Sequence, residues 1–253
     1  MLAPRPYQQE AHDAVVASWR GSTASVVIDA ATGSGKSIIV ALLAQTLYKL
    51  SGGKRVLCLA PSAELIIQNA AKYKAIGEQC SIFSASVSKS LRHQVVFATP
   101  GTFKAVAKRM GHQFAGVIVD ECHGITNTIK QIIEDMRQTS PNLRVCGLSA
   151  TPYRLADGFI FGIDPQGKAL PQDIAKDPYV YQCIYSMPVR LLLAQGYLTP
   201  LRAADINAAQ YDTGGLKVQS NGQFSADTVR VAFEGWGRKT AAIVADVVAQ
   251  TQS

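Results

Sequence analysis

One short stretch of this sequence has the residue types and spacing of a phosphate-binding loop. Residues 30–37 read Ala-Ala-Thr-Gly-Ser-Gly-Lys-Ser. Glycine at positions 33 and 35 lets backbone N–H groups curl around an anion with no Cβ in the way. Lys36 can then reach the β- and γ-phosphates of a nucleotide, and the Ser37 hydroxyl can ligate Mg²⁺. We therefore expect ATP or ADP with Mg²⁺ to be held by Thr32, Gly33, Ser34, Gly35, Lys36 and Ser37.

The residues around this loop favour the same interpretation. A β-branched apolar run, residues 24–28, precedes it, as expected of a buried strand. Apolar residues at helical spacing follow it through Leu50, so the loop joins a strand to a helix N-terminus. Ala30 stands where the G-x-x-x-x-G-K-[ST] pattern has its first glycine, and a small residue there still permits the turn. A Gly-Ser loop that binds nothing is the alternative, and it fits this context poorly.

A pair of acidic residues supplies the remaining chemistry of a nucleotide hydrolase. Asp120 and Glu121 directly follow the apolar run 115–119. A carboxylate at this place can hold the Mg²⁺ that bridges the β- and γ-phosphates, and its neighbour can orient and deprotonate the attacking water. We assign the metal to Asp120 and the catalytic base to Glu121. Without the phosphate loop, the pair would read equally well as a solvated strand end.

Two further features suggest ligands. Gln8 follows Pro6 at the start of a predicted helix, and its amide offers the donor and acceptor that read the N6 and N7 edge of adenine. Lys104 and Lys108 share one face of a later predicted helix, where they can neutralise phosphates of a nucleic acid without reading its sequence. Solvated surface side chains are the alternative in each case.

The elements that must position these residues alternate between strands and helices. Strands are predicted near residues 24–28, 54–60, 80–83, 94–98, 114–119 and 143–148, with helices between them. This alternation predicts an α/β fold with a doubly wound, mostly parallel sheet and helices on both faces. Ligands bind such sheets at the carboxyl ends of strands, where the polar clusters lie. From residue 153 the chain reads as loop-rich, with helices at 187–195, 227–233 and 239–249.

Composition limits the other possibilities. Residues 1–150 carry 16 Lys and Arg against 9 Asp and Glu, whereas residues 151–253 carry 9 of each. The basic excess therefore lies in the half with the phosphate loop, which suggests a polyanion as a partner. No run of about 18 uncharged apolar residues is present, so we expect no membrane span. The five cysteines are scattered, which is typical of buried free thiols in a cytoplasmic protein.

Six short motifs occur in the order found in the first RecA-like lobe of superfamily 2 helicases, which residues 5–152 resemble. They are Tyr7-Gln8, residues 31–37, Pro61-Ser62, Thr99-Pro100-Gly101, the DEAH-box-like Asp120-Glu121-Cys122-His123, and Ser149-Ala150-Thr151. The resemblance implies that Arg5 joins Gln8 at adenine. It also implies that His123, Ser149 and Thr151 link the γ-phosphate to the nucleic acid. Contacts to a nucleic-acid backbone would come from Pro61, Ser62, Thr99 and Gly101.

A narrower similarity extends over nearly the whole chain. Segments at 5–11, 148–155, 183–185, 196–200, 210–212 and 220–222 resemble the RadD family of bacterial DNA-repair helicase-like ATPases. This similarity implies single-stranded or branched DNA and other DNA-repair proteins as partners. The motor of a restriction-type DNA translocase and a non-catalytic nucleotide-binding module remain alternatives.

The division of the chain follows from the same comparison. We expect residues 1–152 to form the ATP-binding lobe and residues 153–253 to form an extension of it. This extension would lead to a second RecA-like lobe that the given sequence lacks. An arginine finger from such a lobe can accelerate hydrolysis by about 10³–10⁵. We therefore expect these 253 residues to bind ATP or ADP, to hydrolyse ATP weakly and not to unwind DNA alone.

Overall fold

The computed structural model describes residues 3–155, 157–176, 178–200, 215–217 and 224–233. It divides the chain into two units, residues 1–199 and residues 200–253. The segments 210–212 and 220–222, which resemble the RadD family, and the helix predicted at 239–249 lie outside the described residues. None of the described helices is long and apolar enough to cross a bilayer.

Within the described residues, nine strands form one sheet in the order β10-β11-β1-β7-β6-β2-β5-β3-β4. Neighbouring strands are parallel except β3 and β4, which confirms the predicted mostly parallel sheet. The strands are β1 (Val26–Ala30), β2 (Arg55–Leu59), β3 (Cys80–Ser84), β4 (Ser88–Lys89), β5 (Val95–Ala98), β6 (Phe114–Asp120), β7 (Arg144–Ser149), β10 (Phe161–Ile163) and β11 (Val180–Met187). A separate antiparallel pair is formed by β8 (Tyr153–Arg154) and β9 (Gly158–Phe159).

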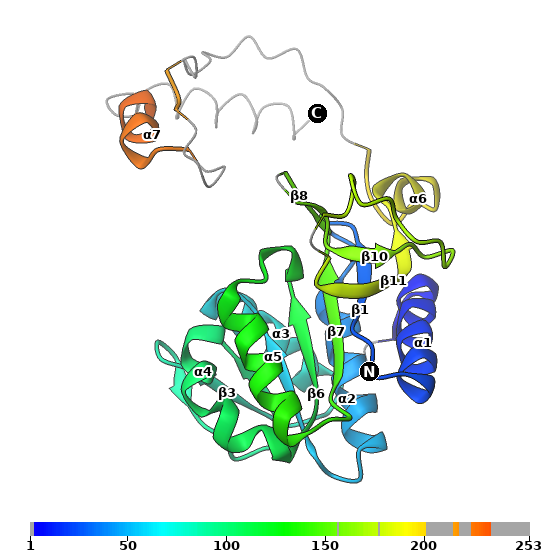
Figure 1. Ribbon diagram of the computed structural model, residues 1–253, viewed down its shortest axis with the longest axis vertical. Helices are drawn as coiled ribbons and strands as arrows, with labels where there is room; N and C mark the ends of the chain where they lie inside the picture. The colour runs from blue at the N-terminus through cyan, green and yellow to red at the C-terminus, as the bar shows by residue number, and fades with distance from the viewer. Residues whose placement is uncertain (1–2, 156, 177, 201–214, 218–223, 234–253) are drawn as a thin grey trace. The chain divides into compact units, whose positions relative to one another are not determined.

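Helices cover both faces of the sheet (Figure 1). One face packs against α1 (Pro6–Gly21), α2 (Lys36–Leu50), α3 (Ala63–Ala75) and α6 (Val189–Ala194). The other face packs against α4 (Pro100–Met110) and α5 (Asn127–Thr139). In the second unit, the described part contains α7 (Ala226–Phe233), as the sequence predicts. Apolar side chains alternate between the two cores along β1, where Val26 and Ile28 face one core and Val27 faces the other.

The sequence explains where the helices near the site begin. Pro6 and Pro100 occupy first-turn positions of α1 and α4, where the missing N–H of proline costs no hydrogen bond. The Ser62 hydroxyl accepts a hydrogen bond from the Leu65 N–H at 3.3 Å and so caps α3. Gly35 precedes α2 in the left-handed region, with φ of 80°.

Two predictions about the later part of the chain need correction. The passage after residue 153, predicted as loop-rich with helices, also contains the eight-residue strand β11, which pairs with β1 beside the phosphate loop. The helix predicted from Met187 begins at Val189, because Met187 is the last residue of β11 and Pro188 is the extended N-cap residue of α6. The five cysteines are free and buried, as predicted.

Candidate functional site

The phosphate loop joins the carboxyl end of β1 to the start of α2, as the sequence predicts. Gly33 and Gly35 have φ of 81° and 80°, values that residues with a side chain rarely adopt. A Cβ on Gly35 would lie 2.5 Å from Nε2 of Gln8, and one on Gly33 would lie 2.9 Å from Leu198. The Ser34 hydroxyl is buried and has no hydrogen-bond partner in the described part of the chain, whereas Thr32 is exposed. The loop therefore has the shape that a bound phosphate requires.

The Gln8 side chain holds this loop from the α1 side. Its Nε2 donates to the Ser34 carbonyl at 2.8 Å, and the Tyr7 hydroxyl donates to the same carbonyl at 2.9 Å. Its Oε1 accepts from the Arg5 N–H at 2.9 Å, and Gln8 is only 1% exposed. Both ends of the amide are thus engaged within the chain, so adenine reading by Gln8 stays a prediction. The Arg5 guanidinium lies 5.1 Å from the centre of the Tyr197 ring.

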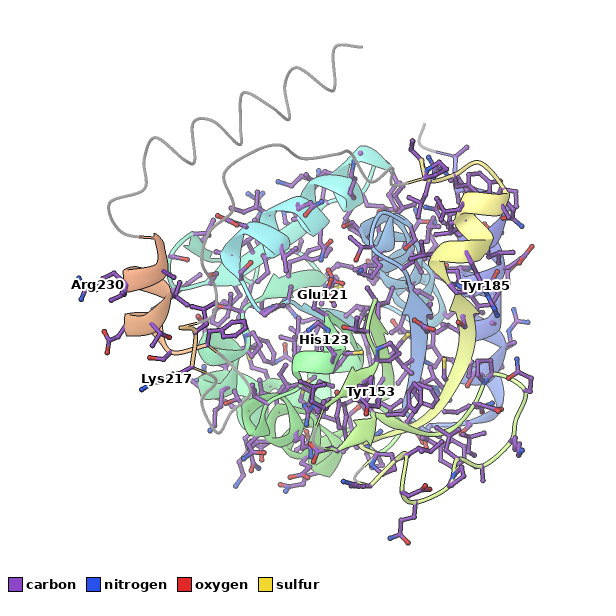
Figure 2. All side chains as sticks on the ribbon, turned by 90° about the horizontal axis from the view of Figure 1, so that it is seen from above. Glu121, His123, Tyr153, Tyr185, Lys217 and Arg230 are labelled. Carbon is purple, nitrogen blue, oxygen red and sulfur yellow. The ribbon has the colours of Figure 1, made fainter. Side chains whose placement is uncertain are left out.

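Four side chains from three strand ends form a connected polar row. Nζ of Lys36 lies 3.3 Å from Oε1 of Glu121, and Oε2 of Glu121 lies 3.3 Å from Nδ1 of His123. Nδ1 of His123 lies 2.9 Å from the Ser149 hydroxyl, which also accepts from the Thr151 N–H at 3.1 Å. Figure 2 shows Glu121 and His123 beside each other. The structure thus brings together the loop lysine, the predicted base and the segment Ser149-Ala150-Thr151.

Asp120 lies at the end of β6 on the α3 side, and it is only 4% exposed. Its Oδ2 accepts from Nδ2 of Asn69 at 2.8 Å, and its Oδ1 accepts from the Glu121 N–H at 3.0 Å. Burial raises the pKa of the Asp120 carboxyl, the Asn69 hydrogen bond opposes this rise, and the Glu121 charge adds to it. Asp120 is therefore a fixed carboxylate whose charged form is costly until a cation compensates it.

The donor set fits one Mg²⁺ in the manner typical of nucleotide sites. A carboxylate from Asp120 and a hydroxyl from Ser37 are hard oxygen ligands, and Mg²⁺ commonly completes such sites with phosphate oxygens and water. No group of three or more His, Cys, Asp or Glu that could hold a metal occurs among the described residues. Two protein oxygens leave the other positions of an octahedral Mg²⁺ to phosphate oxygens and water.

The predicted nucleic-acid residues lie along neighbouring strand ends. Pro61 and Ser62 follow β2, and Thr99 and Gly101 follow β5, which pairs with β2. Pro61 and Gly101 are exposed, whereas the Ser62 hydroxyl is engaged in capping α3. The Thr99 hydroxyl donates to that of Thr102 at 3.0 Å. Lys104 and Lys108 are exposed on α4.

Sequence reasoning missed several residues that hold this site. Asn69 binds the Asp120 carboxylate from 51 residues away, and Arg154 and Tyr179 bind backbone carbonyls of the loop after β6. Tyr197 and Leu198 contact Tyr7 and the Gly33 region. The sequence contains no local signal for Asn69 or Tyr179. Arg154 lies three residues after Ser149-Ala150-Thr151, inside the segment 148–155, and Tyr197 and Leu198 lie inside the segment 196–200, so their positions in these segments are the available hints.

Comparison with protein-family models matches residues 1–154 to the type III restriction enzyme, res subunit. A comparison with curated proteins found no match. Among solved structures, the UvsW helicase from bacteriophage T4 is similar with a TM-score of 0.55 and 21% identity, over 73% of this chain and 60% of that one. A nuclease-deletion mutant of the type ISP restriction-modification enzyme LlaGI, in complex with a DNA substrate mimic, has a TM-score of 0.55 and 17% identity. That match covers 78% of this chain and 21% of the LlaGI chain.

Proposed function

Because the chain belongs to the type III restriction enzyme res subunit family, whose match spans residues 1–154, we propose that it is the ATP-binding motor lobe of a superfamily 2 DNA translocase or helicase. The polar row from Lys36 through Glu121 and His123 to Ser149 carries this proposal. It connects the group that would meet the γ-phosphate to the segment through which such motors respond to nucleic acid.

The residues act in the following way when Mg·ATP is bound. Lys36 exchanges its ion pair with Glu121 for the β- and γ-phosphates, which frees the Glu121 carboxylate to accept a proton from the attacking water. Ser37 and Asp120 would hold the Mg²⁺, which supplies electrostatic stabilisation of the phosphoryl oxygens when bound. The His123 ring contacts both the Glu121 carboxylate and the Ser149 hydroxyl, so a movement of Glu121 would be passed through this ring to Ser149.

Two more specific functions fit this lobe. The RadD-like segments at 183–185 and 196–200 favour a DNA-repair ATPase acting on single-stranded or branched DNA. The family match favours the motor of a restriction-type translocase, which is the second candidate. The chain spans 60% of the phage helicase and 21% of LlaGI, and both whole-protein activities therefore remain proposals here. We propose that the 253 residues alone bind ATP, hydrolyse it weakly and do not separate strands.

Hydrolysis of ATP in the presence of single-stranded DNA, duplex DNA and RNA tests this function. We expect slow hydrolysis by the chain alone and stimulation by DNA. Affinity for single-stranded DNA falls with salt, and replacement of Lys104 and Lys108 by alanine should make this dependence shallower. The magnitude of the slope of log affinity against log salt should decrease by about 1.4, because each lost phosphate contact removes about 0.7. Alanine at Lys49 and Lys54, at the far end of α2 and the start of β2, is the control.

Three results would contradict the proposal. An equal response to every polymer would favour a nucleotide-binding module, and robust strand separation by this chain alone would contradict the expected weak activity. An unchanged salt dependence in the variant with alanine at Lys104 and Lys108 would show that the α4 surface is not part of the nucleic-acid interface.

A further inference from the structure

The backbone that follows β6 carries a strained residue at the centre of the proposed reaction. Glu121 has φ of 52°, and it is the only non-glycine among the described residues with a positive φ. The left-handed conformation is unfavourable for a residue with a side chain. A one-turn 3₁₀ helix, Cys122–Gly124, follows immediately. Such a conformation persists only where neighbouring groups hold it.

Two side chains from later in the chain hold this turn by its carbonyl oxygens. Nε of Arg154 donates to the His123 carbonyl at 3.0 Å, and Nη2 of Arg154 donates to the Ile125 carbonyl. The Tyr179 hydroxyl donates to the Cys122 carbonyl. A planar guanidinium reaches two carbonyls at once with fixed geometry, which a lysine ammonium does not reproduce. Three carbonyls of the five residues after Asp120 are therefore fixed by donors from outside the loop.

The two donors also support each other. The Arg154 guanidinium lies 4.9 Å from the centre of the Tyr179 ring, at cation–π distance. Lys130 of α5 lies 5.2 Å from the same ring. Asp157 lies 3.8 Å from Nη1 of Arg154, but this pair is partly exposed and contributes little. The contact with Tyr179 therefore orients the guanidinium toward the loop.

The positions of the two donors in the chain connect separate parts of the site. Arg154 lies on β8, three residues after Ser149-Ala150-Thr151, and Tyr179 immediately precedes β11. β11 pairs with β1 along its length, and the Met187 carbonyl at its end accepts from the Ala31 N–H at 3.3 Å. Tyr179 lies outside residues 1–154, the part matched by the family model. The strand that the sequence failed to reveal thus ties the loop after β6 to the phosphate loop.

We propose that Arg154, supported by Tyr179, is a positioning residue that holds Glu121 and His123 in the geometry needed to activate water. The inference rests on the proposed ATP hydrolysis, but it concerns a part of the chain to which no motif assigns a role. The hydrogen bonds of Arg154 go to the backbone of the residues after Asp120, so its proposed role is to position this loop and not to bind nucleotide. Its effect should therefore appear in the chemical step and in the mobility of this loop, while nucleotide affinity is retained.

The test compares the full chain with Arg154→Gln, Arg154→Lys and Tyr179→Phe. Arg92→Gln, at an exposed arginine between β4 and β5, is the matched control. Single-turnover hydrolysis with protein in excess over ATP gives two separate quantities, and it can follow a slow reaction. They are the rate of the chemical step at saturation and the protein concentration at half saturation. For Arg154→Gln we expect the saturated rate to fall about 10–100-fold, as for displacement of a catalytic group by about 1 Å. Half saturation should stay within about twofold of wild type, since binding and chemistry are separable. Arg154→Lys should recover only part of the rate.

Hydrogen–deuterium exchange of the same proteins without nucleotide provides the second readout. The Gly124 and Ile125 N–H groups donate to Glu121 and Cys122 carbonyls at 3.1 and 3.0 Å, so they report opening of the turn. We expect about tenfold faster exchange there in Arg154→Gln, as for loss of a hydrogen bond to a charged group. Residues 26–37 should be unchanged. Tyr179→Phe should show a smaller effect of the same kind.

The inference fails under any of three results. Unchanged exchange in the turn would show that Arg154 does not hold it. Faster exchange with an undiminished rate would show that the turn does not matter to the chemistry. Parallel losses of nucleotide affinity, thermal stability and rate would show a general structural role. If the wild-type chain hydrolyses no ATP, the proposed function fails, and the exchange comparison still decides whether Arg154 holds the turn.

Discussion

The Asp120 carboxylate is held in a surrounding that disfavours its charge. It is nearly buried, Glu121 is the next residue, and its compensation within the chain comes from Asn69, the Glu121 N–H and Lys36. Burial raises its pKa in the folded state above the unfolded value. The folded state is therefore favoured below the unfolded pKa, and this contribution is lost as the pH rises through the folded pKa. A buried carboxylate of this kind lowers stability, and the proposed binding of Mg²⁺ would be the function gained in exchange.

Replacement of Asp120 by Asn should accordingly stabilise the nucleotide-free chain near neutral pH, by about 1 kcal/mol. The Oδ1 atom of the new amide can accept from the Glu121 N–H. Its Nδ2 can donate to Oδ1 of Asn69 once the Asn69 amide turns over, since that oxygen has no partner in the described part of the chain. No charge is then buried. The gain should shrink as the pH falls through the raised pKa of the folded state, because the native carboxyl then takes up a proton and loses its charge. Thermal or urea unfolding at several pH values measures this, with Asp173→Asn at an exposed position as control. A less stable variant at pH 7 would show that the electrostatic account of this residue is wrong.

Single residues mark the limit of what the sequence could predict at the site. The phosphate loop and the Asp120-Glu121 pair follow from local strings of residues, because strand, loop and helix are contiguous there. Asn69 lies 51 residues from Asp120 and Tyr179 lies 57 residues from Cys122, so only the tertiary fold brings each pair together. For Gln8, the sequence showed an available amide, whereas the structure engages both of its ends.

The junction between β1 and α2 depends on glycine at position 35 for two separate reasons. Its φ of 80° disfavours any side chain, and a Cβ would lie 2.5 Å from the Gln8 amide that holds the loop. Gly77, after α3, has φ of 92° but no atom within 4 Å of its would-be Cβ. The two glycines therefore share the conformational requirement and differ in the close contact.

Gly35→Ala should weaken ATP binding at least about tenfold, because the loop must shift away from Gln8 to make room. Gly77→Ala should lower the free energy of unfolding by about 1 kcal/mol and leave ATP binding unchanged. Calorimetric titration of both variants, with thermal unfolding alongside, separates the two effects. Equal ATP affinity in the two variants would contradict the role given to the contact between Gly35 and Gln8.

At the level of elements, the doubly wound sheet was predictable, and its extension beyond β1 was not. Strands β1, β2, β5, β6 and β7 consist largely of buried apolar residues, which the sequence shows as continuous runs. In β11, only Val180, Cys183 and Met187 are buried, and half-buried or exposed residues separate them. A strand next to the sheet edge is covered less completely, so its pattern resembles that of a loop.

At the level of the whole molecule, all five buried parallel strands of the predicted lobe end at one edge of the sheet. The phosphate loop, Pro61 and Thr99 come after β1, β2 and β5, and Asp120 and Ser149 are the last residues of β6 and β7. The basic excess of residues 1–150 lies in this same part of the chain. Nucleotide and nucleic-acid chemistry can therefore share one edge, as binding at the carboxyl ends of parallel strands allows. The sequence predicted this arrangement because each strand end carries its polar residues locally.

Titration of ATP and ADP by calorimetry, with Mg²⁺ present, tests the central claim most directly. The wild-type chain should bind both nucleotides, and Lys36→Ala should lose at least about tenfold in affinity, because a charge-assisted contact to phosphate contributes about 1.5–3 kcal/mol. Lys49→Ala, at an exposed lysine near the end of the same helix, should bind as the wild type does. Equal binding by the wild-type chain and Lys36→Ala, or no binding by the wild-type chain, would contradict the assignment of this loop as the ATP site.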